Sequence, residues 1–328
     1  MIHTYMTHTY PPIQAYQSEM LQVDEIHSLY LEQTGNPDGI PVLYLHGGPG
    51  AGLAPIYRSF FDPQKYRIIG FDQRGCGKST PFGELKGNDT QSLLADIQQI
   101  KRHLGIKRWM LCGGSWGTTL ALLAAIEDPQ SVTSLVLRGI FLAREDDFNW
   151  YLHAEGGPAQ VFPEYYQEFI NPISAHLAQH SVVEAYYQQL THSDELSRMA
   201  AVRSWCMWEE RIAKLHATIA EHDLSHDVHR AISLALLECH YIKHRCFVEE
   251  GFILSQIDKI AHIPATIIHG RYDMVCKLEG AYTLRQRWHN SQLLIVPESG
   301  HSTSEPLIAE AICQATDAMA KFLNETHK

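Results

Sequence analysis

Short apolar runs that end in glycine-rich loops recur along this 328-residue chain, and they limit its fold more than any other feature. They lie at residues 41–50, 66–79 and 108–117, and a fourth apolar run covers residues 132–141. Apolar runs without polar alternation are typical of strands buried on both faces of a parallel sheet. Helical patterns separate the runs, at residues 90–105 and again before Pro129. These features predict an α/β fold with a mostly parallel sheet flanked by helices.

The middle of the chain has a different pattern. Between residues 143 and 252 it is rich in Trp, Tyr, His and charged residues, and it predicts helices without strands. Strand signals return at residues 263–273 and 291–301. A helical insertion within the sheet is the simplest account, and it would form a lid where such sheets bind ligands. The expected units are a core at residues 1–142, a helical cap at 143–255 and the rest of the core at 256–328.

Charge and cysteine content narrow the class of protein. The net charge of -11 argues against a nucleic-acid partner and suits a neutral or cationic small ligand. The seven cysteines form no CxxC pair, which indicates a reduced, cytoplasmic protein rather than a disulfide framework. The first residues show no secretory signal, and no apolar run approaches the roughly 20 residues of a membrane span. We therefore expect a soluble cytoplasmic protein without a membrane partner.

The stretch Gly113-Gly114-Ser115-Trp116-Gly117 matches the G-x-S-x-G pattern of a nucleophile elbow. Glycines on both sides allow a serine to occupy a sharp turn, where the close backbone leaves no room for neighbouring Cβ atoms. Gly and Ser are also common in ordinary turns, so the five residues alone are a weak signal. An apolar run precedes them and a helical pattern follows, which is the context that the elbow requires. Ser115 is therefore the expected nucleophile.

A serine nucleophile needs a base and a carboxylate that orients the base, and in this arrangement they follow at the ends of later strands. Asp273 and His301 each come directly after a predicted strand, whereas Asp258 precedes one and would lie at the wrong end. Two backbone N–H groups must also stabilise the oxyanion. One is expected from Trp116.

The second oxyanion N–H is expected from the glycine loop after the first apolar run. Gly48 is the first choice and Gly47 is the alternative. Glycines let this loop bring an N–H group inward without steric cost.

Two further patterns are weaker. Residues 72–80 end like a phosphate-binding loop, but Asp72 stands where the pattern needs glycine, so nucleotide binding is disfavoured. His222 and His226 have a spacing that could hold a metal, but they lack the glutamate of H-E-x-x-H. A solvated helix face is the better interpretation, and we expect neither a metal nor another cofactor.

A set of motifs, taken in order, resembles those of the proline iminopeptidases (prolyl aminopeptidases). The resemblance runs from about residue 10 to the final helix. It implies an α/β-hydrolase fold with an inserted helical cap, and a serine peptidase that cleaves N-terminal proline from peptides without a metal. The motifs are HGGPG (46–50), DQRGCGKS (72–79), GGSWGTTLAL (113–122), LRGIFLAR (137–144), WCMWEE (205–210), ECHYI (238–242), HGRYDMVC (269–276) and SGHS (299–302).

The resemblance implies roles for individual residues. It gives Ser115 as nucleophile, Asp273 as orienting acid, His301 as base, and Gly48 and Trp116 as the oxyanion amides. It places Glu209 and Glu238 where the family binds the substrate amine, and Phe141, Tyr151 and Cys276 where it holds the proline ring. One departure is Ile242, which stands where relatives carry an aromatic residue. This loosens the ring contact and leaves a wider choice of N-terminal residues open.

The physical chemistry of the substrate supports the glutamates independently. A peptide with a free N-terminal proline presents a cationic secondary amine, which two carboxylates would neutralise. Adjacent Glu209 and Glu210 point in different directions on a helix, so Glu210 is expected on a charged face with Arg211 or Lys214. Two alternatives are a carboxylesterase and an aminopeptidase of broader specificity on the same fold. A binding module without catalysis is disfavoured by the intact serine, acid, histidine and glycine loop.

Overall fold

One mixed sheet forms the centre of the protein. The computed structural model describes residues 9–173, 181–192, 194–215 and 227–326. Within these residues the sheet has eight strands in the order β1-β2-β4-β3-β5-β6-β7-β8. They are β1 (Gln17–Gln22), β2 (Ser28–Gly35), β3 (Ile40–Leu45), β4 (Tyr66–Phe71), β5 (Trp109–Ser115), β6 (Val132–Ile140), β7 (Ala265–Gly270) and β8 (Ser291–Val296). The pairs from β4 through β8 are parallel, which confirms the predicted fold class.

The first two strands were not anticipated from the sequence. β1 and β2 pair antiparallel, and β2 also pairs antiparallel with β4. β1 is largely exposed, so it carries no apolar run. β2 buries Glu32 and Gln33, and their hydrogen bonds to Arg58 and Arg67 allow polar residues inside a strand. These buried polar residues remove the apolar signal.

Successive residues of the central strands point into two separate cores. Leu43 and Leu111 contribute to the core under α1, α2 and α11, whereas their neighbours Val42 and Met110 face the core under α12. The covering helices are α1 (Thr90–His103), α2 (Trp116–Glu127), α11 (Leu278–Arg287) and α12 (Pro306–Thr326), with the short helices η1 (Pro55–Phe60) and η2 (Pro129–Ser131). Burial on both faces explains why these strands read as continuous apolar runs. No helix among the described residues is long and apolar enough to cross a membrane.

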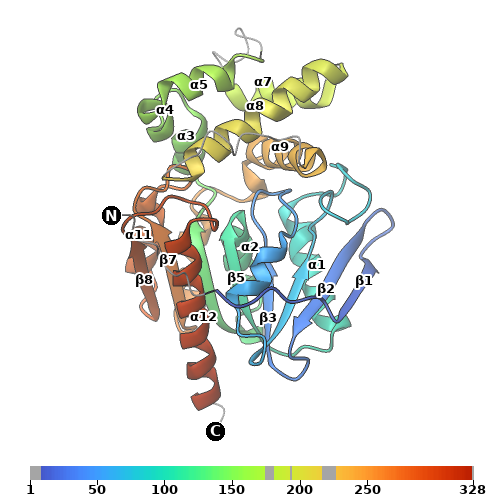
Figure 1. The fold of residues 1–328 in the computed structure, drawn as a ribbon, viewed down its shortest axis with the longest axis vertical. Coiled ribbons are helices and arrows are strands. Elements are labelled where there is room, and N and C mark those ends of the chain that lie inside the picture. Colours follow the sequence, from blue (N-terminus) through green and yellow to red (C-terminus); the bar gives the residue numbers. More distant parts are fainter. Residues whose placement is uncertain (1–8, 174–180, 193, 216–226, 327–328) are drawn as a thin grey trace.

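A group of helices lies between β6 and β7, at the top of Figure 1 and beyond one end of the strands. We call α3 to α9 the cap helices. At the centre of the cap helices, Trp205 and Trp208 of α8 are buried against Phe169 and Tyr186. The helices of the insertion are α3 (Glu145–Leu152), α4 (Gly157–Val161), α5 (Pro163–Ile170), α7 (Val182–His192), α8 (Glu195–Ala213), α9 (Val228–Lys243), η5 (Arg245–Phe247), α10 (Phe252–Gln256) and η6 (Ile257–Lys259). The division at residues 142 and 255 stays a prediction.

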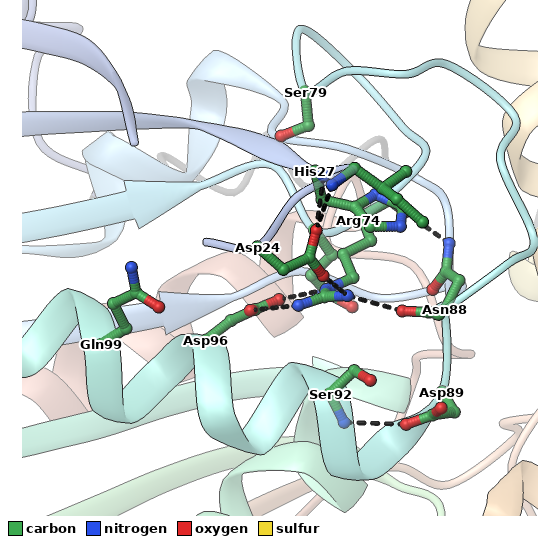
Figure 2. Close-up of polar contacts among 12 residues, drawn as sticks. Asp24, His27, Arg74, Ser79, Asn88, Asp89, Ser92, Asp96 and Gln99 are labelled. Atoms are coloured by element: carbon green, nitrogen blue, oxygen red, sulfur yellow. Dashed lines mark hydrogen bonds and ion pairs between the residues drawn. The ribbon is translucent and has the colours of Figure 1, made fainter. Parts of the chain in front are cut away.

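The loop between β4 and α1 is fixed by a buried arginine (Figure 2). Arg74 donates to both carboxylate oxygens of Asp96 at 2.7 Å, and to Asp24 at 2.6 Å. Asn88, in the same loop, donates to the backbone oxygen of Arg74. Its Oδ1 accepts the Tyr241 hydroxyl at 2.9 Å. Tyr241 belongs to α9, so a cap helix docks directly onto this rigid loop.

Candidate active site

Ser115 occupies a strained turn between β5 and α2. Its φ is 57° and its ψ is -124°, a backbone conformation that residues other than glycine rarely adopt. The flanking glycines are required by space, because a Cβ on Gly113 would lie 2.2 Å from the Gly117 oxygen. A Cβ on Gly117 would lie 2.1 Å from the Leu45 oxygen. The local geometry is that of a nucleophile elbow.

Asp273 and His301 meet at the same edge of the sheet, although 28 residues separate them in the sequence. His301 Nδ1 lies 2.7 Å from Asp273 Oδ2, and Asp273 Oδ1 accepts the backbone N–H groups of Val275 and Cys276. Burial alone would raise the pKa of Asp273. The electrostatic interaction and hydrogen bond with His301, together with His269 and the Cys276 amide, outweigh burial and lower the pKa. Asp273 is thus held as a carboxylate.

A second histidine, which the sequence analysis did not single out, lies against this carboxylate. His269, in β7, has its Nε2 atom 3.4 Å from Asp273 Oδ2 and 2.8 Å from the Cys276 oxygen. Its Nδ1 accepts the N–H of Ile140. Burial lowers the pKa of His269, so its ring is neutral and donates from Nε2. Its position on the strand, four residues before Asp273, was the only available signal among 20 histidines.

Ser115 and His301 are not joined in this structure. Among the hydrogen bonds of the described residues there is none between them, and the contact that Ser115 Oγ makes is to Cys276 Sγ at 4.0 Å. Instead, Arg138 Nη1 lies 3.0 Å from His301 Nε2 and 3.0 Å from the His301 backbone oxygen. Arg138 cannot accept a hydrogen bond, so it donates to an unprotonated Nε2. The sequence analysis missed Arg138, which lies inside a strand.

The glycine loop after β3 passes directly against the elbow. A Cβ on Gly47 would lie 3.3 Å from the Ser115 Cβ. Gly48 has a φ of 103°, and a Cβ there would lie 2.9 Å from the Ala51 nitrogen and 3.2 Å from Leu234 Cδ1 of α9. The choice between Gly48 and Gly47 as oxyanion donor stays a prediction, as does Trp116, the first residue of α2.

The two predicted amine-binding glutamates come from different cap helices, Glu209 from α8 and Glu238 from α9. Glu238 is buried, and its Oε2 accepts the Trp205 indole N–H at 2.6 Å. Glu209 Oε2 is buried without a hydrogen-bond donor among the described residues. Burial raises the pKa of Glu238 well above its usual range, and the charge and hydrogen bond of Glu209 raise it further. The pair therefore forms an acidic site with an uncompensated acceptor.

This acidic pair faces the catalytic edge of the sheet. Leu234 and Glu238 are four residues apart on one face of α9, and Leu234 is the residue beside Gly48. Glu209 lines a cavity of about 730 Å³ together with Ser302, Thr303 and Ser304, which follow His301 directly. The cavity thus connects Glu209 with the loop of the candidate base.

The three residues expected around the proline ring come from three segments of the chain, and their grouping into one pocket stays a prediction. Cys276 is beside Ser115, as given above. Tyr151 of α3 is buried near the glutamates, whose charges add to burial in raising its pKa. Phe141 follows β6, and its ring packs edge-on against Phe148 at 5.7 Å. Ile242 lines a cavity of about 530 Å³ with Phe148.

The two weaker motifs gain no support as ligand sites. In the loop that resembles a phosphate-binding loop, the Asp72 carboxylate accepts the N–H groups of Leu53 and Lys78, so a negative charge already occupies it. His222 and His226 lie outside the described residues. Within the part of the chain that is described, no three His, Cys, Asp or Glu side chains are grouped to hold a metal.

Comparisons with known proteins agree with this geometry. A family model described as "alpha/beta hydrolase fold" matches residues 40–305. A proline iminopeptidase from Xanthomonas citri is 43% identical over 315 residues, which cover 95% of this chain and 99% of that protein. A probable proline iminopeptidase from Leptolyngbya boryana is 42% identical over 313 residues, covering 95% and 97%. The proline iminopeptidase of Arabidopsis thaliana is 42% identical over 315 residues, covering 96% and 82%.

Solved structures with lower identity share the fold. An esterase from Exiguobacterium antarcticum superposes with a TM-score of 0.62 at 20% identity, covering 93% of this chain and 100% of that chain. A proline iminopeptidase-related protein from Thermus thermophilus gives a TM-score of 0.61 at 17% identity, covering 94% and 99%. At these identities the likeness concerns the fold alone.

Proposed function

Because this chain belongs to the proline iminopeptidase family of α/β-hydrolases, we propose that it is a serine aminopeptidase that releases proline from the N-terminus of peptides. The observation that carries the proposal is the pair of Glu238, which is buried, and half-buried Glu209, whose Oε2 atom is buried, beside the catalytic edge. Within the described part of the chain no ion pair to a basic side chain joins these carboxylates, so placing them together is costly, and a substrate ammonium would compensate them. A simple ester has no group that would do so.

The proposed first step is attack by Ser115 Oγ on the carbonyl carbon of the N-terminal residue. His301 Nε2 takes the serine proton, and Asp273 stabilises the imidazolium through Nδ1. In the free protein the lone pair of His301 Nε2 accepts a hydrogen bond from Arg138. His301 therefore has to exchange Arg138 for the serine hydroxyl as its donor before the attack.

The tetrahedral intermediate places its oxyanion on the proposed amides of Gly48 and Trp116. His301 then gives its proton to the leaving amine, which departs and leaves a prolyl ester on Ser115. Water attacks this ester with His301 as base, and proline is released. The ammonium of the substrate stays on the glutamates throughout, which fixes the position of the scissile carbonyl.

A comparison of two substrates tests the proposal. Proline anilide has the free secondary amine, and acetyl-proline anilide lacks its charge and adds bulk. We expect turnover of the first and nearly none of the second. Equal turnover of both would remove the requirement for a free amine, and turnover of a short-chain ester alone would replace this proposal with a carboxylesterase. A panel of other aminoacyl anilides measures how far specificity extends beyond proline, which Ile242 leaves open.

A further inference from the structure

Gln73, the second residue after β4, bridges the two segments that carry the proposed oxyanion amides. Its side-chain Nε2 donates to the His46 backbone oxygen at 3.0 Å, and its Oε1 accepts the Trp116 indole N–H at 2.9 Å. Its backbone N–H donates to His46 Nε2 at 3.0 Å. His46 directly precedes the glycine loop, and Trp116 directly follows the nucleophile. Three hydrogen bonds from one buried residue thus set the spacing between loop and elbow.

The imidazole of His46 passes this constraint to the glycine loop. Because its Nε2 accepts from Gln73, its proton is on Nδ1, which donates to the Gly47 oxygen at 2.9 Å. Burial lowers the pKa of His46, so the ring remains neutral and keeps this arrangement. The Gly47 carbonyl and the Gly48 N–H belong to one trans peptide and point in opposite directions. Anchoring the carbonyl on the imidazole therefore fixes the direction of the Gly48 N–H.

The elbow side is held equally firmly. Trp116 is fully buried, its indole N–H is bound by Gln73, and its ring packs edge-on against Tyr241 at 5.0 Å. Gln73 itself is fixed by its neighbour Arg74, which is clamped by Asp96 and Asp24 (Figure 2). Every polar side-chain atom of Gln73 and of His46 already makes a hydrogen bond within the protein.

We propose that Gln73 is a positioning residue, which acts through His46 and Trp116 to aim the two oxyanion amides at one point. The inference rests on the proposed function, because the amides matter only if Ser115 forms a tetrahedral intermediate. Gln73 touches no reacting atom. Its effect is therefore expected on the stabilisation of the transition state and not on the binding of the substrate.

Two substitutions grade the effect. Gln73→Glu keeps an acceptor for Trp116 but sets a carboxylate oxygen against the His46 oxygen, and Gln73→Met removes both side-chain bonds. Loss of one oxyanion donor costs about 10²–10³ in kcat, so a displaced donor is expected to cost about 10- to 100-fold. KM for proline anilide should stay within about twofold, since ground-state binding is untouched. A short-chain ester should lose the same factor as the anilide.

A proline boronate forms a tetrahedral adduct with Ser115 that occupies the oxyanion site. Its inhibition constant would not change if Gln73 only stabilised the fold. Its inhibition constant should rise by the same factor as kcat falls, whereas the affinity for the product proline should not change. Gln33→Met is the matched control: Gln33 is also buried, and it accepts from Arg67 at 2.6 Å in β2. This control should lower the melting temperature and leave kcat unchanged.

Trp116→Phe removes the same hydrogen bond from the other side, and it keeps the inference testable if a Gln73 variant does not fold. The double variant Gln73→Met/Trp116→Phe should lose less than the product of the single losses, because both changes break one contact. Folded Gln73 variants with unchanged kcat, or with equal losses in boronate and proline binding, would overturn the inference. A wild-type protein that cleaves esters but not proline anilide would refute only the proposed substrate, and the ester rates would still test Gln73.

Discussion

The elbow and the cap hold their candidate residues by different physical means. Ser115 is fixed by backbone: a strained φ, glycines without room for a Cβ, and strands buried on both faces. Glu209 and Glu238 are held by the side chains of two cap helices, α8 and α9: Glu238 accepts the Trp205 indole N–H, and Glu209 Oε2 has no hydrogen-bond donor among the described residues. In the proposed mechanism, the core therefore supplies chemistry that any acyl substrate can use. The cap supplies a charge requirement that only an amine can meet.

The comparison predicts two separable kinds of damage. A change at the elbow should reduce turnover of every substrate alike. A change in the acidic pair should reduce turnover of substrates with a free amine and spare neutral esters. The loop that contains Asn88 fixes the position of α9, and with it the acidic pair, relative to the elbow.

Removal of the expected nucleophile should have the largest effect on the activity that depends on the core. Ser115→Ala deletes only one oxygen, so the fold should remain intact while kcat for both proline anilide and a short-chain ester falls by about 10⁴-fold or more. Steady-state rates and circular dichroism measure the two quantities. A labelling experiment with a fluorophosphonate probe is the control, because it should mark the wild-type protein and not the variant. Activity near that of wild type would assign the attack to another residue.

Neutralising one carboxylate of the pair should break only the contribution of the cap. A charge-assisted hydrogen bond is worth about 1.5–3 kcal/mol, so Glu209→Gln or Glu238→Gln should lower kcat/KM for proline anilide about 10- to 150-fold. The same variants should hydrolyse a short-chain ester as well as wild type. Glu210→Gln, at the next position on α8, is a matched control with the same chemistry. Equal losses on anilide and ester would show damage to the triad or fold and would contradict the anchor.

The sequence predicted the core well because its rules are local. Burial on both faces produces apolar runs, and the elbow needs glycines at fixed positions, so six strands and Ser115 could be read directly. Asp273 and His301 could be predicted as neighbours, which the structure joins at 2.7 Å, because partners in this arrangement follow strand ends. β2 escaped notice because its buried Glu32 and Gln33 look like surface residues until their arginine partners are known.

Contacts between distant segments could not be read in the same way. Arg138 reaches His301 across 163 residues, and no spacing rule links a strand arginine to a histidine loop. His269 and Gln73 likewise gain their meaning only from what the fold places beside them. The glutamates were assigned through the family resemblance, since two acidic residues on separate helices carry no local signature.

The pH dependence of binding should sharpen the contrast further. The hydrogen bond between Glu209 and Glu238 requires one shared proton, and the pKa of Glu238 is raised. The ammonium binds the deprotonated pair, so below that pKa the proton competes and KM for the anilide rises, by up to about tenfold per pH unit. The ester makes no use of the pair. The ratio of kcat/KM for anilide to that for ester should therefore fall as the pH falls, and a ratio independent of pH would contradict the shared proton.

Cys276 lies beside Ser115, where both the anilide and the ester would react. Its substitution is expected to have the smallest effect on turnover. Its Sγ lies 4.0 Å from Ser115 Oγ, so a bulky thiol reagent attached to it would fill the space that the scissile group needs. Burial raises the pKa of its thiol, and the thiolate is the reactive form, so inactivation should be slow and should speed up as the pH rises. Cys276→Ala removes a single sulfur atom and should keep kcat/KM within about threefold of wild type while losing most of the sensitivity.

Cys313→Ala is the matched control for this prediction. Cys313 is also buried, but it lies on α12 and donates to the Ser59 oxygen, on the face of the sheet under α12. The reagent should inactivate Cys313→Ala at the same rate as the wild type. Proline should protect the wild type and Cys313→Ala alike, because it covers the site. Anilide and ester turnover should be lost together on modification, because the reagent blocks Ser115 and not the acidic pair. Loss of anilide turnover alone would place the modified thiol in the cap, with Cys206, beside Glu209 and Glu238, as the next residue to replace.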